Sequence, residues 1–137
     1  MFLGVLLFAL LTAQQDVRGP EVSEKAARTP AQQKINSQLL YEIYKRRGEA
    51  EKKQIPPETT GVRIGADGRA LVDIRADVSS VLLRTIVRVG GRIVATSAPD
   101  RSVIALVPVL RLETLAADPA VRFIEPAAEA TTHRDPR

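Results

Sequence analysis

The stretch that begins with R-A-L-V-D-I-R-A (residues 69–76) and ends with D-P-A-V-R-F-I-E-P-A-A-E-A (residues 118–130) decides the fold expected for this chain. Its hydrophobic pattern predicts a strand, a helix, two strands, a helix and a final strand, in that order. This is the split βαβ order, in which two helices cover one face of a four-stranded antiparallel sheet. The other face of such a sheet stays open, so we expect it to meet a partner.

The individual elements follow from local spacing. Apolar residues occupy every second position of residues 69–76, as in a strand with one apolar face. Ser79 is placed to cap the following helix, and Gly90-Gly91 to end it. Two short β-branched runs (93–96 and 103–107) flank a Pro-Asp turn and predict two strands. A short helix (109–117) and a closing strand (121–125) complete the order.

The chain has 137 residues, which is room for one domain with tails. The apolar run F-L-G-V-L-L-F-A-L-L is too short to span a bilayer and is typical of a signal peptide, with cleavage after Ala13. A buried helix or a short membrane anchor is the alternative. The prediction is therefore a secreted or periplasmic protein with no membrane span once the signal is removed. The chain is thus expected to begin with a signal peptide (1–13), a flexible linker (14–30) and an amphipathic helix (31–54). The βαββαβ domain (62–129) and an exposed tail (130–137) follow.

The predicted helix over residues 31–54 has one apolar stripe. Its members recur at helical spacing and are Ile35, Leu39, Leu40, Ile43 and Tyr44. Polar and charged side chains fill the other positions. We expect the stripe to dock on the domain or on a partner.

Composition limits the possible functions. The formal net charge of +4 would suit weak attraction to an acidic surface, including nucleic acid. Aromatic residues make up only 4% of the chain, however, and the middle strands lack the base-stacking rings that an RNA-binding sheet needs. Cysteine is absent, which excludes a disulfide framework and a thiolate zinc site. Neither G-A-D-G (65–68) nor G-G (90–91) is followed by the lysine and hydroxyl residue that a phosphate-binding loop needs. We expect the protein to bind no metal and no cofactor.

The chain offers no convincing catalytic constellation. His133 is the single histidine, so a Ser-His-Asp triad has one candidate base, in a tail segment with nothing to orient its ring. Four carboxylates could be paired on paper as acid and base, but they fall on different predicted elements: Asp73, Asp77, Asp100 and Glu113. We therefore expect a binding protein and not an enzyme.

About half of the chain resembles the propeptide domain of subtilisin-like serine proteases, the ferredoxin-like prosegment that folds the enzyme and then inhibits it. The most specific parts are the Gly90-Gly91 turn before the second strand and the D-P-x-V-x-x-I-E segment at residues 118–125. The resemblance implies a ferredoxin-like sheet whose open face packs on two surface helices of a protease. Glu125 would then cap the N-termini of those helices, where unpaired N–H groups and partial positive charge favour a carboxylate.

The resemblance also implies a role for the tail, which would lie in the substrate cleft as a strand-like, product-like ligand. The residues that would bind there are Glu129, Ala130, Thr131, Thr132, His133 and Arg134. One departure is that Pro126 and Ala127 follow Glu125 where the family often has further acidic residues. Another is that the chain contains no protease domain, so it is either a free-standing inhibitor or chaperone, or the front of a longer precursor.

Two other hypotheses remain open at the level of sequence. A ferredoxin-like module could bind nucleic acid or a small ligand through the same open face, although the missing aromatics argue against it. The chain could also be a non-functional remnant of a protease precursor.

Overall fold

The structure is a computed structural model that describes residues 24–128. The predicted signal peptide (1–13), the first part of the predicted linker (14–23) and the predicted tail (130–137) lie outside these residues.

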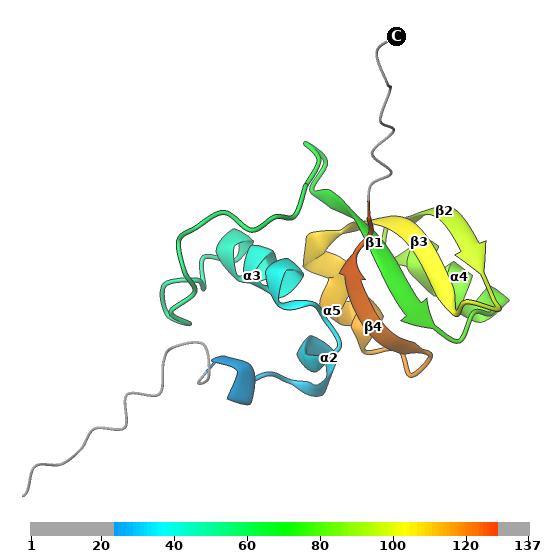
Figure 1. Cartoon of the computed structure of the whole chain (residues 1–137), viewed down its shortest axis with the longest axis horizontal. Coiled ribbons are helices and arrows are strands. Elements are labelled where there is room, and N and C mark those ends of the chain that lie inside the picture. The colour runs from blue at the N-terminus through cyan, green and yellow to red at the C-terminus, as the bar shows by residue number, and fades with distance from the viewer. Residues whose placement is uncertain (1–23, 129–137) are drawn as a thin grey trace, which may run out of the picture.

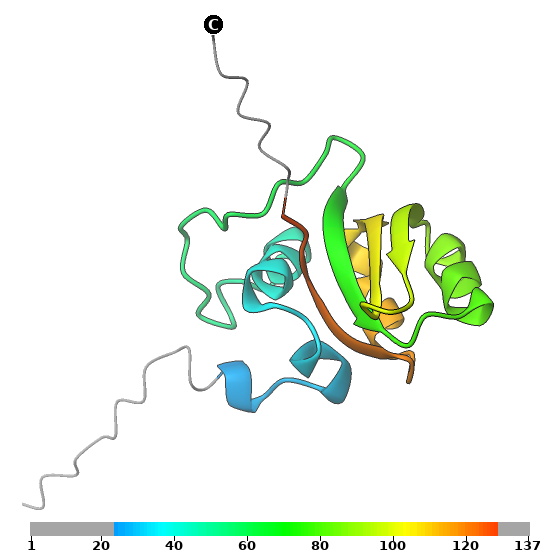
Figure 2. The ribbon, with the colours of Figure 1, turned by 45° about the vertical axis from the view of Figure 1, so that its right-hand side comes forward.

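Four antiparallel strands form one sheet (Figure 1). They are β1 (Arg69–Ala76), β2 (Arg92–Ser97), β3 (Ser102–Pro108) and β4 (Val121–Pro126), in the order β2-β3-β1-β4. Helix α4 (Ser80–Arg88) connects β1 to β2, and a 3₁₀ turn η1 (Val109–Arg111) with helix α5 (Leu112–Ala116) connects β3 to β4. Both connections lie on the same side of the sheet (Figures 1 and 2). The predicted α+β class with a four-stranded antiparallel sheet is thus confirmed.

The start of α4 and the start of β2 show why local sequence determines these elements. The Ser79 hydroxyl accepts a hydrogen bond from the Leu82 amide at 3.2 Å, which caps α4 as predicted. Gly90 has φ +88°, a conformation that favours glycine. A Cβ on Gly91 would lie 2.6 Å from Cγ2 of Ile86, so only glycine lets β2 begin this close to the helix.

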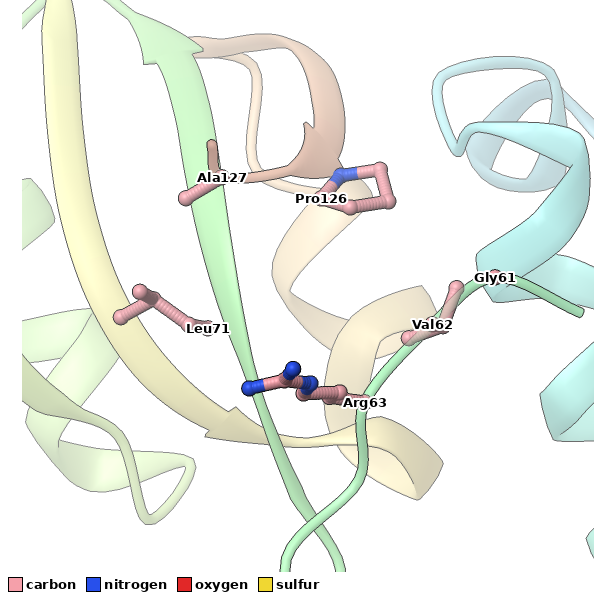
Figure 3. A pocket seen from close by; sticks show the side chains of 6 residues that line it. All are labelled: Gly61, Val62, Arg63, Leu71, Pro126 and Ala127. Carbon is pink, nitrogen blue, oxygen red and sulfur yellow. The ribbon is translucent and has the colours of Figure 1, made fainter. Parts of the chain in front are cut away.

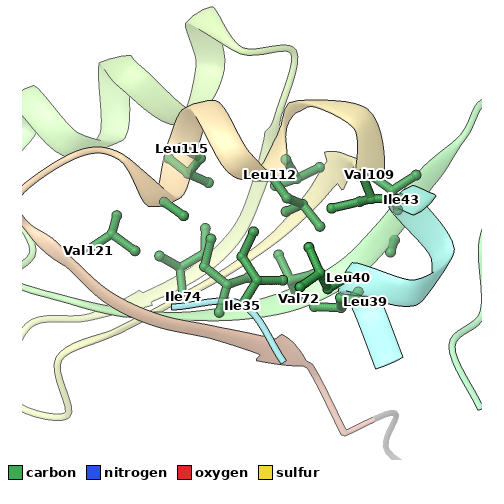
Figure 4. Packing of buried hydrophobic residues seen from close by; sticks show 14 of the residues in the cluster. Ile35, Leu39, Leu40, Ile43, Val72, Ile74, Val109, Leu112, Leu115 and Val121 are labelled. Carbon is green, nitrogen blue, oxygen red and sulfur yellow. The ribbon is translucent and has the colours of Figure 1, made fainter. Parts of the chain in front are cut away.

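The core lies between the sheet and the helices (Figure 4). Alternate residues of β1 and β3 are buried on the helix side and pack against α4, η1 and α5. The segment before the sheet extends this core beyond α5, with Ile35, Leu39, Leu40 and Ile43 placed against Val72 and Leu112 of the domain.

The predicted single helix over residues 31–54 is divided. The structure has α2 (Pro30–Gln33), α3 (Ser37–Arg46) and turns up to residue 54. The break falls at Ile35, which forms a parallel bridge with Ile124 at the outer edge of β4. The Asn36 side chain then caps α3 through the Gln38 amide, and Gly48 (φ +72°) follows its C-terminal end. All five predicted stripe residues are buried.

The prediction of a flexible linker over residues 14–30 is corrected at its end, because Glu24 and Arg28 anchor residues 24–30 to α3. The side chains of Glu24 and Arg28 are 2% and 9% exposed and form a two-bond ion pair at 2.8 Å. Tyr44 donates to Glu24 at 3.2 Å, and Arg28 donates to Ser37 at 3.1 Å. Burial, with Glu24 beside it, raises the pKa of Tyr44 above its ordinary value, so its hydroxyl stays a donor.

Residues 62–64 contact β1 through a single bridge, between Ile64 and Ala70. The turn between them is closed by the Gly65 amide, which donates to the Arg69 carbonyl at 2.9 Å. Gly68, with φ +77°, supplies the left-handed residue that this turn needs.

Candidate binding surface

The face of the sheet opposite α4 and α5 is the candidate binding surface, called the open face below. Strand register brings its side chains together, since Asp73 of β1 lies opposite Ile104 of β3 and Glu125 of β4. The alternate positions on these strands are half-buried or exposed, whereas those on the helix side are buried. The side chains of the open face are Leu71, Asp73, Arg75, Ser102, Ile104, Leu106, Phe123 and Glu125.

A polar cluster lies at the centre of the open face. Arg75 contacts Asp73 at 3.0 Å (Nη2 to Oδ2) and Glu125 at 3.6 Å (Nε to Oε1). The Ser102 hydroxyl donates to the other oxygen of Asp73 at 2.6 Å. Asp73 is therefore fully engaged, whereas Glu125, with a side chain 39% exposed, has only the longer contact with Arg75.

Apolar side chains lie on both sides of this cluster. Leu71 is opposite Leu106 in the pairing of β1 with β3, and Phe123 is opposite Arg75 in the pairing of β1 with β4. Ile104 of β3 lies opposite Asp73. These four apolar residues are half-buried and gather on one face, and contiguous apolar area of this kind is typical of a contact surface. The open face thus offers apolar area around one weakly engaged carboxylate.

Shallow pockets border the open face where β1 begins and β4 ends. One lies between the segment before β1 and the end of β4 (Figure 3), and its lining residues are Gly61, Val62, Arg63, Leu71, Pro126 and Ala127. A second shares Arg63 and Leu71 with it and reaches Leu106 on β3. A partner on the open face would therefore meet a hollowed border at this end.

The structure settles the position of one predicted site residue. Glu125 lies on the open face, beside Arg75, whereas Arg122 of the same strand pairs with Asp77 at 3.0 Å. The other predicted site residues lie outside the described residues: Glu129, Ala130, Thr131, Thr132, His133 and Arg134. Sequence reasoning missed Arg75 and the apolar residues around it. The one available signal was Leu71, an apolar residue on the otherwise polar face of β1.

The carboxylates considered for catalysis do not meet one another. Asp77 pairs with Arg122, Asp100 accepts from the Ser97 hydroxyl at 2.6 Å, and Glu113 contacts Arg47 at 3.0 Å. Within residues 24–128 no group of three or more metal-binding side chains is present. Across that same part of the chain, no helix has the length and apolar character required to cross a membrane.

Comparison of the chain with protein-family models, with curated proteins and with solved structures finds no match.

Proposed function

We propose that the chain is a propeptide-like binding domain that engages a subtilisin-like serine protease, as an inhibitor or a folding chaperone. The observation that supports this most is the open face, where apolar side chains surround the accessible carboxylate of Glu125. Such a face suits docking onto surface helices of another protein, since helix N-termini accept a carboxylate and helix sides accept aliphatic contacts.

We further infer that the domain is ferredoxin-like. The element order β1-α4-β2-β3-α5-β4 supports this, together with the antiparallel pairing of β1 with both β3 and β4. The position of α2 and α3 supports the binding role. Residues 34–36 pair with the outer edge of β4, and α3 joins the core on the helix side, so neither helix covers the open face (Figures 1 and 2).

The longer contact between Arg75 and Glu125 suits an exchange of partners. At 3.6 Å and with both side chains about half accessible, this ion pair contributes little in water. Glu125 can therefore turn from Arg75 to the amides of a helix N-terminus at small cost. The tail at residues 129–134 follows β4 directly and in this proposal occupies the substrate cleft.

The proposal is tested by the turnover of a chromogenic peptide by a purified subtilisin-like protease with the full chain added. We expect turnover to fall, and Ile104→Arg to abolish the effect, because a charge at the centre of the open face prevents docking. Val87→Arg is the matched control, since Val87 is an exposed valine on α4. Glu125→Gln should weaken inhibition several-fold, and Glu51→Gln, at an exposed position away from the sheet, should not.

Removal of residues 129–137 separates the two parts of the proposal. If the shortened chain still binds the protease without slowing turnover, the tail is the inhibitory element and the open face is the docking element. Unchanged turnover at micromolar wild-type chain, with circular dichroism confirming that the chain is folded, would rule the proposal out.

A further inference from the structure

The two edges of the sheet differ in how their backbone groups are used. At the β4 edge, the Asn36 amide donates to the Ile124 carbonyl and the Ile124 amide donates to the Lys34 carbonyl, both at 2.8 Å. At the other edge, β2 pairs with β3 alone, and no segment among residues 24–128 pairs with its outer side. An unpaired edge is a template for another strand.

Unpaired arginines accumulate around this open edge. Within the described part of the chain, six exposed arginines have no ion pair and no side-chain hydrogen bond, and four of them lie between residues 84 and 101: Arg84, Arg88, Arg92 and Arg101. The other two are Arg46 on α3 and Arg111 in η1. Elsewhere, arginines such as Arg28, Arg47 and Arg122 have carboxylate partners. From Val78 to Leu112 the only acidic residue is Asp100, whose side chain accepts from Ser97.

The arrangement of these arginines matches an extended ligand. Arg92 is the first residue of β2 and Arg101 lies in the turn that follows it, so the pair brackets the strand. Six residues of strand span about 20 Å. Arg84 and Arg88 are four residues apart on α4, the helix next to β2 (Figure 2), on the side away from the buried Leu82.

We propose that the outer edge of β2 binds an extended acidic segment of a partner protein by strand addition. The backbone of the segment would pair with β2, and its carboxylates would meet Arg92 and Arg101, while Arg84 and Arg88 on the outer side of α4 add to the positive charge nearby. Val94, 57% exposed and located where the register shifts between Ile93 and Ala95, limits the pairing to a short segment. Arg92 lies opposite Leu106 and therefore borders the open face, but strand addition uses the outer backbone edge of β2 and does not depend on the protease proposal.

An acidic peptide fits this edge better than either a second copy of the chain or single-stranded nucleic acid. A second copy of the chain paired through β2 would bring two sets of unpaired arginines together, which is repulsive. Single-stranded nucleic acid would satisfy the charges but needs stacking rings, and neither β2 nor α4 contains an aromatic residue. An acidic peptide uses both the charges and the free backbone groups.

The test is fluorescence anisotropy of the full chain with a labelled, end-capped eight-residue peptide of alternating Glu and Val. We expect saturable binding that weakens with salt and is absent for the Lys-Val counterpart. The doubly reversed variant Arg92→Glu/Arg101→Glu should weaken binding by about tenfold or more. Arg46→Glu, an exposed arginine on α3 at the far side of the molecule, is the matched control and should bind like wild type.

A Glu-Val peptide methylated at every backbone nitrogen separates strand addition from simple charge attraction. It keeps all its carboxylates but cannot donate backbone hydrogen bonds, so we expect its binding to be lost. Equal binding of the methylated peptide would overturn the proposal. So would equal or tighter binding of an oligothymidylate of the same length, or unaltered binding by the Arg92→Glu/Arg101→Glu variant with wild-type circular dichroism.

Discussion

The two edges of the sheet in this protein are treated in opposite ways. At the β4 edge the chain supplies its own cover, with residues 34–36 paired to Ile124 and α3 buried beyond them. At the β2 edge the strand is exposed along most of its length and arginines surround it. The covered edge is packed with Ile, Leu and Tyr, whereas the uncovered strand begins with Arg92 and is followed by Arg101 in the next turn.

The difference shows two physical solutions to one problem. An unpaired strand edge promotes aggregation unless it is covered or charged. Covering it with apolar side chains adds to the core of a small domain that has few aromatic residues to fill it. Charging it keeps the copies apart and leaves the strand available to an oppositely charged ligand. Mutations at the two edges should therefore have very different effects on stability.

The largest effect is expected from Leu40→Ala on the covered side. Leu40 is fully buried between α3 and the sheet, so its removal leaves a cavity and should cost about 2–5 kcal/mol of unfolding free energy. Leu110→Ala makes the same chemical change at a side chain that is 47% exposed, and should stay within about 0.5 kcal/mol. Urea unfolding followed by circular dichroism measures both, and similar losses for the two variants would contradict the arrangement of α3.

The second effect concerns the ion pair that holds residues 24–30 on α3. Glu24→Ala leaves the guanidinium of Arg28 buried without its partner and should cost about 3 kcal/mol. The double variant Glu24→Met/Arg28→Met leaves no charge behind and should cost less than the single one. Asp77→Ala, which breaks an exposed ion pair with Arg122, should change the unfolding free energy by about 1 kcal/mol or less.

The third effect is on the β2 side and comes from packing. Gly91→Ala places a Cβ 2.6 Å from Cγ2 and 2.7 Å from the carbonyl oxygen of Ile86, and should cost about 1–3 kcal/mol. Gly61→Ala has open space around it and should be neutral or slightly stabilising. If Gly91→Ala were as neutral as Gly61→Ala in thermal unfolding, β2 would not start this close to α4.

The smallest effect on stability is expected from the helix caps, and it should be equal for α4 on the β2 side and α3 on the β4 side. Ser79→Ala removes the cap of α4 and Asn36→Ala that of α3, each a single hydrogen bond to a backbone amide. Each substitution should lower the unfolding free energy by about 1 kcal/mol, because capping is local and does not depend on which edge is covered. Ser79→Thr and Asn36→Asp, which can keep the bond, are the controls in the same urea titration.

Much of the βαββαβ region could be predicted because its signals are local. The alternation in residues 69–76, the cap at Ser79 and the glycine pair at 90–91 each determine structure within a few residues. The break at Ile35 could not be predicted, since it depends on pairing with Ile124, which is remote in sequence. Residues 24–30 have a linker-like composition but are held by Tyr44 and Ser37, again through remote contacts.

The candidate site was predictable only in part for the same reason. Glu125 was identified from the closing segment, but its neighbour Arg75 becomes visible only when β1 and β4 are paired in register. That register shifts between Arg75 and Ala76, an irregularity that alternation alone does not reveal. The role of residues 129–134 in a protease cleft remains a prediction.

The pairing of residues 34–36 with β4 has a consequence for biosynthesis. Residues 34–36 contact β4, which is synthesised after the other three strands of the sheet, so the N-terminal helices have no complete docking site until β4 has left the ribosome. Contacts of such long sequence separation slow folding, because the intervening chain must be ordered first. The nascent chain therefore has to remain incompletely folded, with the apolar side of α3 unsatisfied, until β4 has been made.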